Sequence, residues 1–108
     1  MDEVTIPEDG GSFKFLVIEY QDKKYIRWAE ILPGIDVDHK NIGRDFIEEL
    51  VEEGLPEELG SITGDRANIN DKKIEVLGWG SRSYPMSDFD EVKQLIEGAF
   101  PEYSVVRN

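Results

Sequence analysis

The stretch FKFLVIEY, residues 13–20, decides the fold, because its apolar, aromatic and β-branched side chains predict a strand. The turn QDK follows, and KYIRWAE, residues 24–30, predicts a second strand that pairs with the first as a hairpin. Pro33 and Gly34 then break the chain.

Lys14 interrupts the apolar run of the first strand. In a pleated strand it points to the face opposite Phe13 and Phe15. It shares its face with Leu16 and Ile18, and we expect a helix to cover these apolar side chains. A buried ammonium there is costly, so Lys14 either meets an anion at the rim of the helix or extends to water over the strand end.

A helix is predicted after the break, with Asp38 as its N-cap and Gly54 as its stop. One apolar stripe supports it, made of Ile42, Phe46 and Leu50 with Ile47 and Val51 beside them. Gly43 inside this helix costs about 1 kcal/mol relative to alanine, so its packing must compensate.

The rest of the chain predicts three more strands and a second helix. The strands are expected at residues 61–69, 73–79 and 103–107. Ser87 is the expected cap of the second helix, and Pro101 ends it. Its expected apolar face consists of Val92, Leu95, Ile96 and Ala99.

The predicted order is therefore β-β-α-β-β-α-β, an α/β (α+β) fold with one mixed sheet of about five or six strands and two helices. The 108 residues fit a single domain, residues 1–108, in which residues 1–11 are expected to be flexible.

Composition narrows the classes of function. The chain has no cysteine and one histidine, so a disulfide framework, thiolate chemistry and a structural zinc site are excluded. No apolar run is long enough for a membrane span, and the acidic start is unlike a signal peptide. We expect a cytoplasmic monomer that does not bind a membrane.

Charge argues against nucleic acid as a partner, because 24 acidic residues oppose 12 lysines and arginines and the formal net charge is −12. The acids cluster in EELVEEGLPEEL, residues 48–59, and in SDFDEV, residues 87–92. Such runs are typical of solvated helix faces.

His39, the only histidine, opens the first predicted helix. Free backbone N–H groups at a helix start bind anions, phosphate above all. The helix dipole favours a neutral imidazole, which is a base or nucleophile, whereas Asp36 and Asp38 favour the charged form. The sequence leaves that balance open. It also leaves open two other interpretations: a solvated surface histidine, and a metal site built from these aspartates and His39.

Four stretches carry a resemblance to a known family. The first is DGGSFKFLVIEY (9–20), a strand with lysine after phenylalanine, and the second is RWAE (27–30), in a tryptophan strand. The third is DKKIEVLGW (71–79), a DKKI strand entering a glycine turn, and the fourth is GAFPEYSVVRN (98–108), a closing helix, proline and strand. In order and spacing the chain resembles the protein phosphohistidine phosphatases, the family that includes the Janus and Ocnus proteins.

The resemblance implies hydrolysis of phosphohistidine on proteins or peptides, without metal or cofactor. His39, with Ile42 three residues on, corresponds to the catalytic histidine, which acts as nucleophile or as base for water. Lys14 corresponds to the phosphate-binding lysine. Gly80 or Ser81 takes the place of a serine that follows the family's aromatic residue, and Arg66 lies two places from the expected arginine, a position that Gly64 occupies.

The loop GSRS is the other candidate phosphate site, because backbone N–H groups and hydroxyls of Gly80, Ser81, Arg82 and Ser83 can form an anion nest. An ordinary surface loop is the alternative. Trp28 and Trp79 are expected in the core or at its rim.

The chain departs from the family between Glu30 and His39, which are nine positions apart instead of two. Residues 31–37 are therefore largely an insertion. An alignment without it would place Leu32 at the catalytic position, but only the insertion also brings the helix stripe and Gly54 into register. The alternative function is a non-catalytic phosphoprotein-binding or regulatory module that has kept the fold, and a third is a plain interaction domain.

Overall fold

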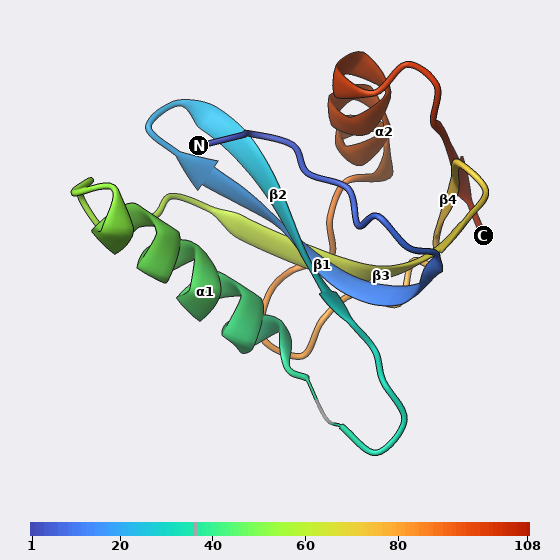
Figure 1. The fold of residues 1–108 in the computed structure, drawn as a ribbon, viewed down its shortest axis with the longest axis horizontal. Helices are drawn as coiled ribbons and strands as arrows, with labels where there is room; N and C mark the ends of the chain where they lie inside the picture. The colour runs from blue at the N-terminus through green and yellow to red at the C-terminus, as the bar shows by residue number, and fades with distance from the viewer. Residues whose placement is uncertain (36) are drawn as a thin grey trace.

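The computed structural model describes residues 1–35 and 37–108 (Figure 1). Its elements are β1 (Gly11–Tyr20), β2 (Lys23–Glu30), α1 (His39–Glu52), β3 (Ile62–Asn70), β4 (Lys73–Val76), α2 (Phe89–Ala99) and β5 (Ser104–Arg107). The predicted element order is confirmed, with boundaries shifted by one to three residues.

The strands form one mixed sheet in the order β2-β1-β3-β4-β5. The pairings of β1 with β2, β1 with β3 and β3 with β4 are antiparallel, and β4 pairs with β5 in parallel. Among the described residues the fold consists of one sheet of five strands and two helices, which confirms the predicted fold class.

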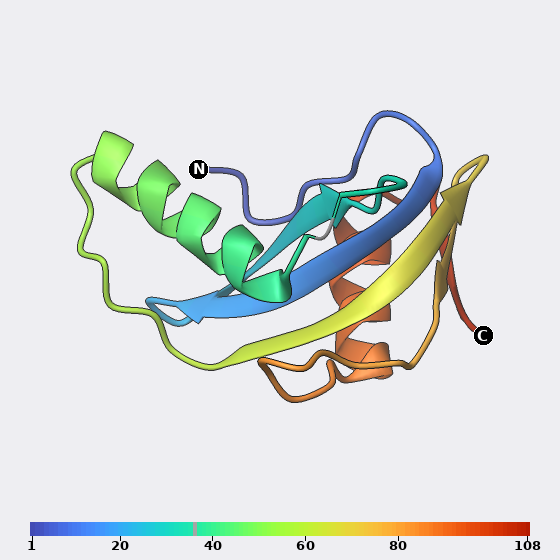
Figure 2. The same cartoon turned by 90° about the horizontal axis from the view of Figure 1, so that it is seen from below.

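The two helices lie on opposite faces of the sheet, as Figure 2 shows from below. Alternate side chains of β1 supply both cores, because a strand points successive side chains to opposite faces. On one face α1 packs Ile42, Phe46 and Leu50 over Leu16, Ile18, Tyr20 and Tyr25. On the other face α2 packs Val92 and Ile96 over a cluster that includes Phe13, Phe15, Val17, Ile26, Ile74 and Val105.

The ends of α1 follow the predicted signals. Asp38 is the N-cap and accepts a hydrogen bond from the backbone N–H of Lys40, and Gly54 has a positive φ just beyond the helix. The predicted stripe is too wide, because Val51 is 55% exposed. Gly43 is buried, and an added Cβ would lie 3.3 Å from the hydroxyl of Tyr84, so this glycine lets the loop after β4 approach the helix.

The start of α2 differs from the prediction. Its N-cap is Asp88, whose side chain accepts from the N–H of Asp90. Ser87 is buried, and its hydroxyl donates to Thr63 Oγ1 of β3. Both residues are good caps, and the pairing of the preceding segment with β3 decides between them. Ala99, expected on the apolar face, is exposed.

The segment before β1 runs along the outer edge of β2. The N–H of Ile26 donates to Glu3 O, and Trp28 Nε1 donates to Thr5 O at 2.6 Å. Arg27, 9% exposed, donates to the backbone oxygens of Asp2 and Glu3 and to both carboxylate oxygens of Glu49 on α1. Residues 2–5 therefore shield an edge strand that would otherwise be open to another chain.

α1 covers only part of its face of the sheet, since it packs on β1 and β2 (Figure 1). On β3 it reaches Ile62 and Gly64, and within the described residues no helix packs on the same face of Asn68 or of β4. In that part of the chain, no helix has both the length and the apolar character needed to cross a membrane.

We predict that Arg27→Met lowers the free energy of unfolding by about 2 kcal/mol, because it removes several charged hydrogen bonds from a buried position. Urea denaturation measures this change. Amide hydrogen exchange at residues 2–5 should accelerate at the same time.

Lys23→Met is the matched control. Lys23 lies on β2 like Arg27, but its ion pair with Glu3 is exposed. Its effect should stay within about 0.5 kcal/mol. Equal losses in both variants would show that Arg27 has no special role at this edge.

Candidate functional site

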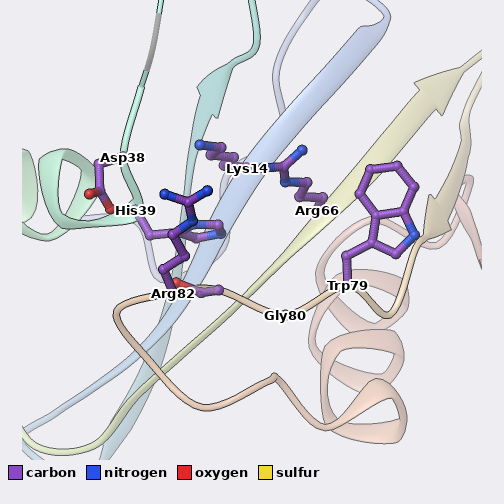
Figure 3. A pocket seen from close by; sticks show the side chains of 8 residues that line it. Lys14, Asp38, His39, Arg66, Trp79, Gly80 and Arg82 are labelled. Atoms are coloured by element: carbon purple, nitrogen blue, oxygen red, sulfur yellow. The ribbon is translucent and has the colours of Figure 1, made fainter.

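Two cations lie side by side on the face that α1 partly covers. Lys14 of β1 and Arg66 of β3 are direct partners in the antiparallel register, and both line one hollow (Figure 3). Side chains of direct partners start about 5 Å apart, and like charges there repel each other. An anion between them would remove that repulsion.

His39 enters the same hollow from the start of α1. It is only 3% exposed, and its Nε2 lies 2.9 Å from the carbonyl oxygen of Asp65. The ring rests against Gly64, where an added Cβ would come within 2.9 Å of His39 Cδ2. A side chain at position 64 would therefore displace the imidazole.

That hydrogen bond decides the tautomer of His39. A backbone carbonyl only accepts, so Nε2 must carry the proton. In the neutral ring the lone pair is then on Nδ1. Within residues 1–35 and 37–108, Nδ1 of His39 has no hydrogen-bond partner. Every fully buried side-chain nitrogen or oxygen in that part of the chain has a partner, so Nδ1 is not fully buried. The basic nitrogen of His39 is thus the one left to face the hollow.

The surroundings lower the pKa of His39 below its ordinary value. Burial is the main cause, and the positive charges of Lys14 and Arg66 add to it. The hydrogen bond to Asp65 and the charge of Asp38 act in the opposite direction but do not prevail. The balance that the sequence left open therefore favours the neutral imidazole near neutral pH.

The start of α1 is not the open anion site that the sequence suggested. The Asp38 carboxylate accepts from the N–H of Lys40 at 3.1 Å and from the hydroxyl of Ser83 at 3.2 Å. The first of these bonds is the main reason that the pKa of Asp38 is lowered. A negative charge thus occupies the helix end and ties it to the loop after β4.

Asp65 is the site residue that sequence reasoning missed. It is 1% exposed, and its Oδ1 accepts from the N–H groups of Arg66, Trp79 and Gly80 at 2.7–3.1 Å. Its carbonyl holds His39, so one residue positions both the histidine and the loop. The available signal was an aspartate, a poor strand former, in a predicted strand.

The hollow has a volume of about 400 Å³. Its lining consists of Lys14, Asp38, His39, Arg66, Trp79, Gly80, Ser81 and Arg82. Six of the seven candidate residues therefore line one space, and the seventh, Ser83, is not among the lining residues but donates a hydrogen bond to Asp38. Among the described residues, none of the cations Lys14, Arg66 and Arg82 forms an ion pair.

The inserted segment borders this hollow. The Lys14 ammonium donates to the carbonyl oxygen of Val37, so the end of the insertion holds this cation beside His39. Asp36, part of the alternative metal site, lies outside the described residues. Elsewhere in the chain, no group of three or more His, Asp and Glu side chains is arranged to hold a metal ion.

Arg66 reaches the hollow because of its position on β3. Positions 64 and 66 share one face of β3, because side chains alternate along a strand. The His39 ring occupies the space that a side chain at position 64 would need. Arg66, two residues further along, lines the same hollow.

No family model matches the chain, and a search of curated proteins finds no significant match.

We predict that the midpoint of the His39 titration lies below the usual value near 6.5. The imidazole proton signal in NMR measures it without assignment, because His39 is the only histidine. Lys14→Ala should raise the midpoint by removing a positive charge, and Asp38→Asn should lower it by removing a negative one. Midpoints near 6.5 in all three proteins would mean that the ring is solvated.

We also predict that Asp65→Ala destabilises the protein by about 3 kcal/mol, because three N–H groups lose a charged acceptor. Hydrogen exchange should rise most at Trp79 and Gly80. Asp45→Ala, an exposed change on α1, should stay within about 0.5 kcal/mol. Unchanged protection of the loop in the Asp65 variant would contradict its anchoring role.

Proposed function

We propose that this protein is a phosphohistidine phosphatase that hydrolyses the P–N bond of phosphohistidine on a protein or peptide. The observation that supports this most is a buried imidazole with its proton held at Nε2, beside three cations that have no acidic partner in the described part of the chain. The resemblance in motif order supports the same conclusion.

The cations and the loop bind the phosphoryl group. Lys14, Arg66 and Arg82 face its oxygens, and the backbone N–H of Ser81 adds a donor, whereas the N–H of Gly80 is bonded to Asp65. One unit charge at 4 Å contributes about 4 kcal/mol of attraction at an effective dielectric constant near 20, before desolvation. Such preorganised charge is the main source of rate in phosphoryl transfer.

His39 supplies the reacting atom through Nδ1. In one route its lone pair attacks phosphorus, the P–N bond breaks, and the substrate histidine leaves with a proton from solvent; water then hydrolyses the phosphorylated His39. In the other route Nδ1 takes a proton from water as the water attacks phosphorus, the P–N bond breaks, and the substrate histidine leaves with a proton from solvent. The hydrogen bond to Asp65 stabilises the positive charge that develops on the ring in both routes.

The position of the Asp38 carboxylate supports a second candidate function, that of a module that binds phosphoprotein without turnover. The carboxylate lines the hollow and brings a negative charge toward the phosphoryl oxygens. Binding without phosphate release would identify this function.

We predict that the purified protein releases phosphate from a phosphohistidine peptide in the presence of a chelator. His39→Ala should reduce kcat/KM by at least about 10³-fold. Asn41→Ala, two residues from His39 on α1, serves as the control and should retain activity. Undiminished turnover by a folded His39→Ala protein would refute the assignment.

A further inference from the structure

The hollow around His39 continues past Trp79. A second hollow of about 430 Å³ shares Arg66 and Trp79 with the first as lining residues. We call it the Asn68 groove, and its further lining includes Ser12, Ile31, Asn68, Glu75 and Leu77.

The groove exists because α1 stops short of this part of the sheet. Ile74 and Val76 point into the core under α2, so Glu75 between them faces the other side. Asn68 is its direct partner on β3, and both are half-buried. Within the described residues no helix covers them.

The groove suits an extended polypeptide. Ile31 borders it on the β2 side, since its N–H donates to Ser12 O, and Leu77 borders it on the β4 side, since its N–H donates to Arg66 O. Ser12 donates to Asn68 Oδ1 at 2.8 Å, which orients the amide and leaves its NH₂ group to donate to a peptide carbonyl.

Trp79 marks the junction between the two hollows. Its side chain is 65% exposed, although tryptophan is usually buried or in contact with a partner. Arg66 lies over its ring and holds it in place. A chain that leaves the His39 hollow must pass this aromatic surface to reach Asn68.

We propose that the Asn68 groove binds the substrate polypeptide next to the phosphohistidine, and that Glu75 selects a basic residue there. This rests on the proposed phosphatase function. Positions 66 and 68 are about 7 Å apart along β3, so Glu75 faces a residue about two or three positions from the phosphohistidine. Among the described residues Glu75 forms no ion pair, and its charge is available to the substrate.

The overall charge agrees with this selection. A formal net charge of −12 repels an acidic partner at long range, and Glu75 adds a local preference at one position. The two effects are separable, because charges beyond about 8 Å are screened at physiological salt.

Two phosphohistidine peptides test the proposal, one with lysine and one with glutamate at the second position on both sides of the phosphohistidine. For the wild type at 0.15 M salt we expect kcat/KM to be at least about 10-fold higher for the lysine peptide. In Glu75→Lys the ratio should fall to about 1 or below.

Glu58→Lys is the matched control. It makes the same charge change at an exposed site between α1 and β3 that lines neither hollow. Its ratio should stay within about twofold of the wild type. Equal changes in both variants, or a wild-type ratio near 1, would overturn the proposal, since only net charge would then matter.

Failure of the phosphatase function gives a different result, namely no phosphate release by the wild type from either peptide or from free phosphoramidate. The groove is then judged by amide NMR with the unphosphorylated peptides. Shifts at Ser12, Asn68 and Leu77 with the lysine peptide, lost in Glu75→Lys, support the groove. Shifts elsewhere or none overturn it.

Discussion

The antiparallel register between β1 and β3 is the constraint on which the site depends. It sets Lys14 opposite Arg66 and brings Gly64 under the imidazole of His39. A slip of one residue would turn Arg66 into the core under α2 and bring the Asp65 side chain to the other face. The register is secure because β1 buries both of its faces, so a slip would also exchange the two cores.

Asp65 converts this register into a positioned site. Its backbone carbonyl holds the ring of His39, and its carboxylate holds the N–H groups of Trp79 and Gly80. The helix start, the strand and the loop are thus joined through one buried residue. Asp38 makes a second link between α1 and the loop through Ser83, and it closes the helix end that otherwise binds anions.

An acidic protein can keep a cationic hollow because electrostatic effects are local. The acids of α1 lie mostly on its exposed face, and salt screens them beyond about 8 Å. Lys14, Arg66 and Arg82 line one hollow, and salt screens an interaction at such short range much less than it screens the distant acids. Burial, together with the charges of Lys14 and Arg66, lowers the pKa of His39 and favours its neutral ring.

The sequence by itself determined the element order, the N-cap at Asp38, the stop at Gly54 and the face on which Lys14 lies, because these follow from periods and capping chemistry within a few residues. It misplaced the cap of α2, since Ser87 and Asp88 are equally good locally and only the bond to Thr63 separates them. It missed Asp65 and the Asn68 groove, and it left the charge of His39 open. These depend on residues distant in the sequence, such as His39 and Asp65 or Ser12 and Asn68, that meet only in the folded sheet, where the pairing of strands and the extent of α1 decide which groups are buried together.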